Sequence, residues 1–361
     1  MNLERALRTN LSLMVHESAG GLVITVNDKP SITLGGEWEP VTTCLYCVNG
    51  IDTFDEVLER VGKLGVARDD ARDILTFCLD ENIVEYVYPE SQEPGDDLSA
   101  YELMKWDRQI KNFATLDGKT GSDARDFQGA LGNSHVVIVG VGGVGSYLAL
   151  SAAMMGIGRV TLVDFDSIEL SNTSRQVLYT EDDLGRTKIE TAADRLRAHN
   201  PRTRYHLENR EISSSSDLEV VLDRAEARLG AIDFVFISAD TPRGKIQYIA
   251  DDACTPRGIA WMNLGPFGFS KAQVGPIIVP GVTESYAQYF PRTLIDGSNS
   301  TIGEINARFE ANIMDSYNGI AAKMGMIEAV KFLTGYARPA ALGAVVELDT
   351  ADWSTRVHVC E

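Results

Sequence analysis

The sequence contains no run of 18 apolar residues, and its first residues lack the basic-then-apolar layout of a secretory signal. These absences predict a chain without a transmembrane helix and favour a cytoplasmic location. An excess of basic residues is also missing, because 33 Lys and Arg stand against 52 Asp and Glu, for a formal net charge of -19. Phosphate backbones and anionic lipids repel so acidic a chain, so we expect neither nucleic acid nor a membrane as its partner.

Cysteine is scarce, and its five copies are Cys44, Cys47, Cys78, Cys254 and Cys360. An odd number in a chain without a secretory signal argues against a disulfide framework. Cys44-Leu-Tyr-Cys47 has the spacing of half a zinc site, yet no second CxxC completes it. Since residues 41–48 are mostly apolar, we interpret these two cysteines as small buried side chains.

The first 88 residues predict a small domain of strands followed by helices. Short β-rich segments, separated by glycine and proline, predict strands at 11–15, 21–26, 31–34 and 83–87. Helical composition and periodicity predict helices at 37–48, 54–64 and 69–79. Residues 89–97 are polar and contain two prolines and a glycine, which predicts a linker. Residues 98–361 then form the second predicted domain, which begins with helical composition over 98–111.

From Ser134 onward, strand and helix patterns alternate. Strands are expected at 136–139, 159–164, 204–209, 232–238 and 259–264, and helices at 144–155, 187–198, 217–229 and 244–255, with Ser216 as the cap of the third. Such alternation predicts an α/β domain with a mostly parallel, Rossmann-like sheet covered on both faces.

A glycine-rich loop, Gly140-Val-Gly-Gly-Val-Gly145, lies between the first of these strands and its helix. Glycines let the backbone approach a phosphate, and the N-terminus of the following helix favours anionic charge. Asp164 ends the next strand, where its carboxylate can accept hydrogen bonds from a ribose. These features suit NAD as well as ATP.

The residues after the second strand favour ATP. Arg175 and Lys188 follow Asp164 closely, and cations at that place suit a triphosphate whose pyrophosphate must leave, whereas redox chemistry has no evident need for them. Asp240 follows the strand at 232–238, at the edge of an open α/β sheet where ligands bind, and can hold Mg²⁺.

These motifs together resemble the ThiF-like adenylating enzymes of the ubiquitin-activating superfamily. The matching segments are residues 140–145, Asp164-Phe-Asp166, Asn172-Thr-Ser-Arg-Gln176, Asp183-Leu-Gly-Arg-Thr-Lys188 and Ser238-Ala-Asp240. The similarity covers about residue 100 to the C-terminus. It implies that Asp164 binds ribose, that Asn172, Arg175 and Lys188 bind phosphates, and that Asp240 binds Mg²⁺. The implied ATP contacts also include Gly140, Gly142, Gly143, Gly145, Asp166 and Gln176.

The segment Trp106-Asp-Arg-Gln-Ile110 resembles a family motif whose arginine reaches across a homodimer into the partner's ATP site. Arg108 is therefore a candidate catalytic residue acting in trans, with a solvated helix charge as the alternative. Many bacterial members carry two CxxC pairs that bind a structural zinc. Residues 280–286 contain no cysteine and 356–361 contain Cys360 alone, so we expect no structural zinc.

No cysteine stands out as a thioester nucleophile, since Cys254 falls within an expected packed helix. An acyl adenylate would then react directly. Residues 280–315 are expected to cover the substrate. Within or near this cover, Arg292 or Lys271 is a candidate contact for an acidic peptide, with ordinary surface charge as the alternative.

The first domain resembles, in layout and size, the winged helix-turn-helix-like domain that recognises leader peptides. The alternative is a small domain for dimerisation or packing. Both domains together resemble the enzymes that modify microcin C-type and pantocin A-type precursor peptides, and the missing zinc ligands favour the pantocin-like branch. The resemblance implies ATP-dependent activation of a peptide carboxylate, at a Glu side chain or the C-terminus, followed by attack from the same peptide.

Three other functions are alternatives to this interpretation. Activation of a ubiquitin-like sulfur carrier is the alternative within the same enzyme class. A non-catalytic partner that presents a leader peptide is disfavoured by the complete set Arg175, Lys188 and Asp240. An NAD-dependent oxidoreductase is disfavoured by residues 172–188.

Overall fold

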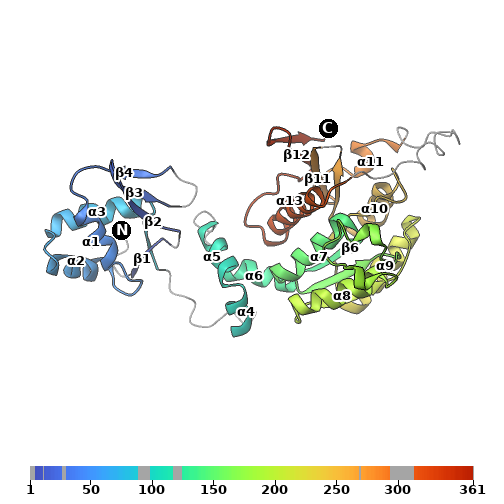
Figure 1. Ribbon diagram of the computed structural model, residues 1–361, viewed down its shortest axis with the longest axis horizontal. Coiled ribbons are helices and arrows are strands. Elements are labelled where there is room, and N and C mark those ends of the chain that lie inside the picture. The colour runs from blue at the N-terminus through green and yellow to red at the C-terminus, as the bar shows by residue number, and fades with distance from the viewer. Residues whose placement is uncertain are drawn as a thin grey trace. The chain divides into compact units, whose positions relative to one another are not determined.

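The computed structural model describes residues 5–10, 12–26, 30–87, 98–116, 124–267, 270–292 and 313–360. The chain divides into two compact units, Met1–Ser99 and Ala100–Glu361, whose elements are labelled in Figure 1. The expected linker at 89–97 and residues 293–312 of the expected substrate cover lie outside the described residues. Within the described ranges, no helix is both long enough and apolar enough to cross a membrane.

The first unit combines a three-stranded antiparallel sheet with three helices. The sheet order is β2 (Met14–Ser18), β3 (Gly21–Thr25) and β4 (Ile32–Leu34). The helices are α1 (Glu39–Cys47), α2 (Phe54–Lys63) and α3 (Arg68–Asp80). The first strand expected from the sequence, 11–15, lies three residues further along as β2.

A second, two-stranded sheet in this unit did not follow from the sequence. Here β1 (Leu7–Thr9) pairs antiparallel with β5 (Val84–Tyr86), so the closing strand does not join the three-stranded sheet. A strand of three residues gives no readable alternation, and its partner lies about eighty residues away along the chain.

One core holds the first unit together. The helix α2 buries Phe54, Val57, Leu58 and Val61 on one face, which is the spacing that the sequence predicted. Its start is fixed by a capping box in which the Glu56 carboxylate accepts a hydrogen bond from the Thr53 backbone N–H at 2.8 Å. Cys44 and Cys47 are buried in this core, as expected from the apolar stretch around them.

The second unit is built on an eight-stranded sheet. Its strands are β6 (His135–Val139), β7 (Arg159–Val163), β8 (Arg204–Glu208), β9 (Phe234–Ile237), β10 (Trp261–Phe267), β11 (Lys271–Ile278), β12 (Ala344–Asp349) and β13 (Ser354–Val359). The order is β13-β12-β11-β10-β9-β6-β7-β8. The pairings from β10 to β8 are parallel and confirm the Rossmann-like α/β fold, whereas β11, β12 and β13 add an antiparallel extension.

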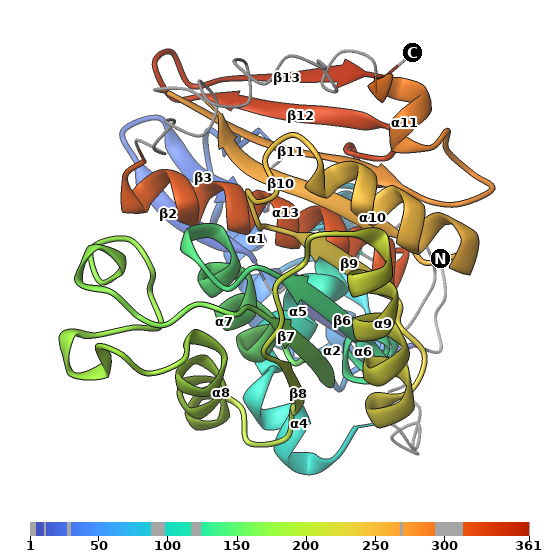
Figure 2. The same cartoon turned by 90° about the vertical axis from the view of Figure 1, so that its right-hand side faces the viewer.

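Helices cover both faces of this sheet (Figure 2). The helices of the second unit are α4 (Ala100–Lys105), α5 (Asp107–Leu116), α6 (Ala124–Asn133), α7 (Gly143–Met155), α8 (Lys188–His199), α9 (Ser215–Leu229), α10 (Ile246–Cys254), α11 (Tyr286–Tyr289) and α13 (Asp315–Thr334). Those that pack against the strands are α7, α8 and α13 on one face and α9 and α10 on the other. Phe234 and Phe236 of β9 belong to the core formed with α7, α8 and α13. Their neighbours Val235 and Ile237 belong to the core formed with α9 and α10, as the two-residue period of a strand requires.

The cap of α9 differs from the sequence-based expectation. Ser214, rather than Ser216, accepts a hydrogen bond from the Asp217 backbone N–H through its Oγ at 3.2 Å. The Asp217 carboxylate in turn accepts the Ser214 backbone N–H at 3.0 Å. The helix therefore begins at Ser215, where this reciprocal pair of hydrogen bonds can form.

The strand order of the sheet reverses at β6. The chain runs from β6 outward through β7 and β8, and then returns to place β9 and β10 on the other side of β6. The connection after β6 leads to one side of the sheet and the connection after β9 leads to the other side. A crevice therefore opens at the carboxyl ends of these two strands. Open α/β sheets bind their ligands at such a point.

Candidate functional site

A pocket of about 950 Å³ occupies this crevice. Its volume lies near the top of the roughly 300–1,000 Å³ range of small-molecule sites. The residues lining it come mainly from the ends of β6, β7 and β9, from the loops after β6, β7, β8 and β9, and from α10, β10 and α13. Charges of both signs are present in equal number: Arg175, Lys188, Arg210, Arg243, Asp164, Asp166, Glu211 and Asp240.

The glycine loop forms the floor of the pocket. Gly140 has φ +88°, and a Cβ there would lie 2.7 Å from the Ala239 backbone nitrogen. A Cβ on Gly145 would lie 1.8 Å from the Gly140 carbonyl oxygen. Ser238 Oγ donates a hydrogen bond to that same oxygen at 2.7 Å. The loop is thus held closely between β6 and β9, with Gly142 as the N-cap of α7, and the helix N-terminus is available to an anion.

Asp164 fixes the shape of this loop. Its Oδ2 accepts the Val141 backbone N–H at 2.7 Å, and its Oδ1 accepts the Asp166 backbone N–H at 2.9 Å. Burial raises the pKa of Asp164, against the lowering effect of Lys188 and the two backbone donors. Each carboxylate oxygen retains a second lone pair, so ribose hydroxyls can still donate to it.

Lys188 is the most deeply placed cation of the pocket. Its side chain is 7% exposed, and its Nζ lies 2.6 Å from Asp166 Oδ2. The Lys188 backbone N–H also donates to the Asp166 carbonyl at 3.0 Å, so the ammonium and its carboxylate partner are positioned together. Asp166, expected to contact ATP, lines the pocket and is at the same time the ion-pair partner of Lys188.

The segment 172–176 brings three polar side chains to the pocket. Asn172 Oδ1 accepts the Glu169 backbone N–H at 3.1 Å, and the Arg175 guanidinium donates to the Ser171 carbonyl. Gln176 is 4% exposed, and its Oε1 has no hydrogen-bond partner within the described part of the chain. Buried amide oxygens are rarely left without a donor, so this one indicates where a bound molecule completes the site.

Asp240 and Arg108 lie in different surroundings. The Asp240 side chain is 73% exposed at the end of β9, 3.9 Å from the Arg243 guanidinium. Arg108 lies on α5 with its side chain 94% exposed, 3.7 Å from Asp107, and does not line the pocket. Gly145 does not line the pocket but lies close to the Gly140 carbonyl. The predicted residues that the structure brings together around the pocket are Gly140, Gly142, Gly143, Asp164, Asp166, Asn172, Arg175, Gln176, Lys188 and Asp240.

Two cations that were candidates for contacting substrate are engaged elsewhere. Lys271 Nζ lies 2.7 Å from the buried Glu347 carboxylate, and Arg292 forms an ion pair with Asp252. Neither lines the pocket. Cys254 is fully buried in α10, and burial raises the pKa of its thiol to about 12, which makes it a poor nucleophile.

Sequence reasoning missed several pocket residues. Asn318, on the first turns of α13, is buried. It lies so close to Gly143 that a Cβ on Gly143 would be 2.6 Å from the Asn318 amide nitrogen. Gln247 of α10 and Asn263 of β10 also line the pocket. A polar residue at the carboxyl end of an expected strand was a usable signal for Asn263. Neither Gln247 nor Asn318 has a comparable signal, because each is one polar residue on a helix.

The ThiF family matches residues 106–360 of the chain. Molybdopterin-synthase adenylyltransferase of Escherichia coli K12 is 30% identical over 257 residues, which cover 70% of this chain and 90% of that protein. The sulfur carrier protein adenylyltransferase of Thermus thermophilus is 28% identical over 233 residues, or 63% of this chain and 79% of that protein.

Among solved structures, E. coli MccB bound to ATP is 22% identical with a TM-score of 0.75, over 98% of this chain and 96% of MccB. A further MccB structure contains AMPCPP and MccA. PaaA is 25% identical with a TM-score of 0.69, over 97% of this chain and 98% of PaaA. These two similarities in fold extend over nearly the whole chain, including the first unit.

Proposed function

Because the chain belongs to the ThiF family and is an ATP-dependent adenylating enzyme, we propose that it activates a carboxylate of a ribosomally made precursor peptide. The observation that carries this proposal is the presence of two separate pockets in one chain. One is the phosphate-loop pocket of the second unit, and the other is an apolar pocket in the first unit. The similarity in fold to MccB, a microcin C7 biosynthetic enzyme solved in complex with N-formylated MccA, supports it.

In the proposed reaction, a carboxylate oxygen of the peptide attacks the α-phosphorus of ATP. The bond to the β-phosphate bridging oxygen breaks, and the products are an acyl adenylate and pyrophosphate. Lys188, Arg175 and the N-terminus of α7 offset the negative charge that develops on the departing phosphates. A nucleophile of the same peptide then attacks the acyl carbon and releases AMP.

Mg²⁺ fits the residues around Asp240. Its carboxylate is exposed to the pocket, and carboxylate oxygens are the protein ligands that Mg²⁺ prefers. Asp164 and Asp166, by contrast, already hold the glycine loop and Lys188. We propose that Asp240 holds the ion, which would neutralise charge on the phosphates.

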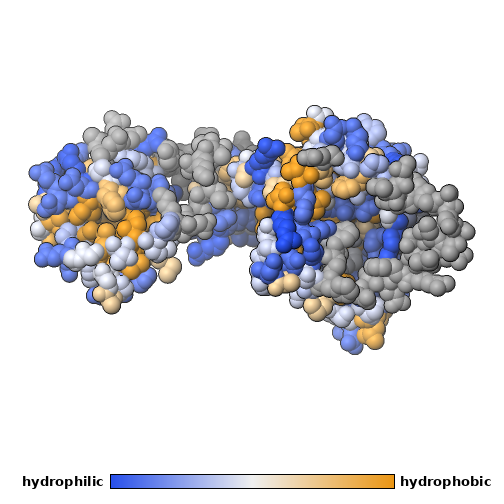
Figure 3. Space-filling model, turned by 90° about the horizontal axis from the view of Figure 1, so that it is seen from above, coloured by the Kyte–Doolittle hydropathy of each residue, from blue (hydrophilic) through white to orange (hydrophobic). Residues whose placement is uncertain are grey.

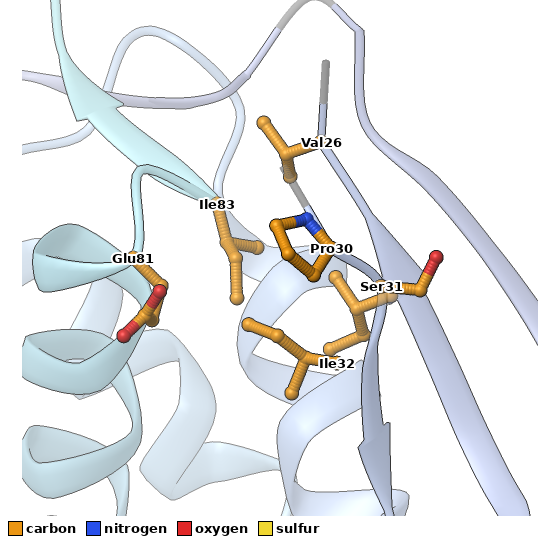
Figure 4. A pocket seen from close by; sticks show the side chains of 7 residues that line it. Val26, Pro30, Ser31, Ile32, Glu81 and Ile83 are labelled. Carbon is orange, nitrogen blue, oxygen red and sulfur yellow. The ribbon is translucent and has the colours of Figure 1, made fainter. Parts of the chain in front are cut away.

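The first unit supplies the proposed leader-binding surface. Its pocket of about 260 Å³ is lined by Ile24, Val26, Pro30, Ser31, Ile32, Glu81 and Ile83. Figure 4 shows Pro30, Ile32 and Ile83 turned toward one space, while the Ser31 hydroxyl points away. Strand β4 is an edge of its sheet, so a peptide can add to it as a further strand and place an apolar side chain in this pocket.

The first unit also exposes apolar side chains away from β4. Figure 3 shows apolar side chains gathered on the face in view. Met14 and Val15 of β2 are among the exposed large apolar side chains of the unit.

We propose that the enzyme is a cytoplasmic homodimer in which Arg108, extended into solvent in the single chain, enters the ATP pocket of the second copy.

The second candidate function is activation of a ubiquitin-like sulfur carrier. The sequence identity to the molybdopterin-synthase and sulfur carrier adenylyltransferases favours it. The two functions differ in substrate, since a carrier is a folded protein ending in Gly-Gly, while a precursor peptide must be held by a leader segment.

Pyrophosphate exchange tests the proposal. The full chain would be incubated with ATP, Mg²⁺ and labelled pyrophosphate, together with short peptides encoded beside its gene or with a carrier protein ending in Gly-Gly. Label entering ATP with a peptide, and not with the carrier, is the expected result. Exchange with the carrier alone would replace peptide activation by the second function. Phosphate rather than AMP as the product would rule out adenylation.

A further inference from the structure

The phosphate motifs leave one end of the pocket without an assigned role. This end is lined by Gln247 near the start of α10 and by Asn263 of β10, beyond Asp240 at the end of β9. Asn263 pairs in parallel register with Ile237, so it reaches the carboxyl edge of the sheet beside the segment that carries Asp240. The reacting carboxylate must approach the α-phosphate from a side that the phosphate-binding residues do not occupy.

The pairing of β10 with β11 is irregular where Asn263 lies. The antiparallel register between β10 and β11 shifts between Met262, which pairs with Ile277, and Leu264, which pairs with Val274. Asn263 stands at this shift and has no partner on β11 in the register. Two residues of β11, Gly275 and Pro276, stand opposite this one residue of β10, so the bulge lies on β11. Bulges of this kind occur next to active sites.

The amide of Asn263 is oriented by its neighbour. Gln247 Nε2 donates to Asn263 Oδ1 at 3.3 Å, which leaves the Asn263 Nδ2 group as the donor. Asn263 is 8% exposed, and within the described ranges its Nδ2 donates to no protein atom. A nearly buried amide donor that lines a substrate pocket matches an acceptor oxygen on the substrate.

We propose that Asn263 binds the acyl group, by donating from Nδ2 to the carboxylate oxygen that does not attack phosphorus, and that Gln247 is a positioning residue for it. This inference rests on the proposed adenylation. The bound oxygen becomes the carbonyl oxygen of the acyl adenylate. It becomes an oxyanion when the peptide nucleophile adds to the acyl carbon, until AMP departs with the electron pair of the C–O bond.

A neutral amide suits this position better than a cation. A guanidinium or ammonium in direct contact would hold the carboxylate as an ion pair and weaken it as a nucleophile toward phosphorus. An amide hydrogen bond orients the carboxylate with less loss of charge density. The same donor is then in place when negative charge returns to this oxygen in the second step.

Binding of stable acyl-adenylate analogues tests the assignment without the natural peptide. The probes are 5′-O-sulfamoyladenosine, which has no acyl group, and its N-acyl derivatives carrying an N-acetyl-γ-glutamyl or an N-acetylglycyl group. These acyl groups stand for a Glu side chain and for a C-terminal carboxyl. Affinities of the full-length chain for the three probes would be measured by titration calorimetry.

For the unmodified chain, we expect at least one acyl probe to bind about tenfold or more tightly than the acyl-free probe. Asn263→Leu should remove that advantage and change the affinity of the acyl-free probe less than about twofold, since one hydrogen bond is lost and the nucleotide contacts remain. Asn263→Ser, with a thermal melt, provides a second variant if the leucine variant fails to fold.

Gln247→Glu tests whether Gln247 acts by orienting the Asn263 amide rather than by filling space. The change preserves size but replaces the donor with an acceptor, so the Asn263 amide would rotate and present its oxygen to the substrate. We expect it to reduce acyl-probe affinity as Asn263→Leu does, and the double variant to lose little more, because both act through one hydrogen bond.

Equal losses for acyl and acyl-free probes in Asn263→Leu, or an undiminished acyl advantage, would overturn the assignment while leaving adenylation standing. Equal binding of all three probes by the unmodified chain would overturn it as well. Failure of the acyl-free probe to bind, with no pyrophosphate exchange, would instead remove the proposed function and this assignment together.

Discussion

Replacing Lys188 by methionine tests whether this residue is catalytic as well as structural. The side chain is almost fully buried, and its Nζ lies 2.6 Å from Asp166 Oδ2. Methionine preserves most of the aliphatic volume and removes the charge, so the phosphates lose a cation and Asp166 loses its partner. Loss of one preorganised charge-stabilising group costs about 10²–10³ in turnover, or roughly 3–4 kcal/mol of transition-state stabilisation.

The stability cost is smaller and comes from Asp166. Breaking a fully buried ion pair costs about 3–5 kcal/mol, because one charge is left without a partner. The Asp166 side chain is 48% exposed, so water solvates much of its charge and we expect about 1–2 kcal/mol. Adding Asp166→Asn removes the unpaired charge, so the double variant should regain most of the stability and none of the activity.

The assay pairs pyrophosphate exchange with urea unfolding for the unmodified chain, Lys188→Met and the double variant. Saturating ATP distinguishes lost turnover from lost affinity. Recovery of exchange to within tenfold of the unmodified chain in the double variant would refute a catalytic role for Lys188. It would mean that the single variant was inactive because Asp166 had lost its partner.

Three further predictions address other parts of the molecule. Ile32→Asp, at the apolar pocket of the first unit, should weaken peptide binding by tenfold or more and leave ATP affinity unchanged. Thr33→Asp, the exposed neighbour on β4, is the matched control, and equal effects of the two in fluorescence anisotropy would contradict a pocket-specific contact. Burial acts to raise the pKa of Asp183, but hydrogen bonds from Thr180 and the charge of Arg195 lower it to about 2. A lowered pKa gives stability that is present above the unfolded pKa near 4 and is lost as pH falls toward 2. Between about pH 4 and pH 2, the free energy of unfolding from urea titrations should therefore fall by about 2 kcal/mol less for Asp183→Asn than for the unmodified chain. If the free energies of the two chains fall in parallel with pH, this linkage is excluded. If Arg108 acts in trans, mixing inactive Arg108→Ala and Lys188→Met chains should restore up to about a quarter of the exchange activity, whereas no recovery despite mixed dimers would place Arg108 outside the mechanism.

The glycine loop of the pocket could be predicted from the sequence because backbone geometry there tolerates few alternatives. A Cβ on Gly140 or Gly145 would collide with backbone atoms, so these positions require glycine and the pattern is readable. The run of serines at 213–216 offered several equivalent caps. The choice of Ser214 depended on which one the Asp217 carboxylate could reach in three dimensions.

The proposed acyl side of the pocket was hidden from the sequence for a different reason. Phosphate is recognised by backbone N–H groups and a few cations, and these leave a fixed spacing in one continuous segment. The proposed carboxylate contact instead depends on Asn263, Gln247 and a shift in the register of β10 against β11, which converge only after the sheet has formed. If this division is general, ThiF-like chains should share the loop and Lys188 while differing in β10 at the position opposite the bulge, where each would match its own acyl group. Exchanging Asn263 for a residue of different shape should then change which acyl probe binds best and leave the nucleotide affinity in place.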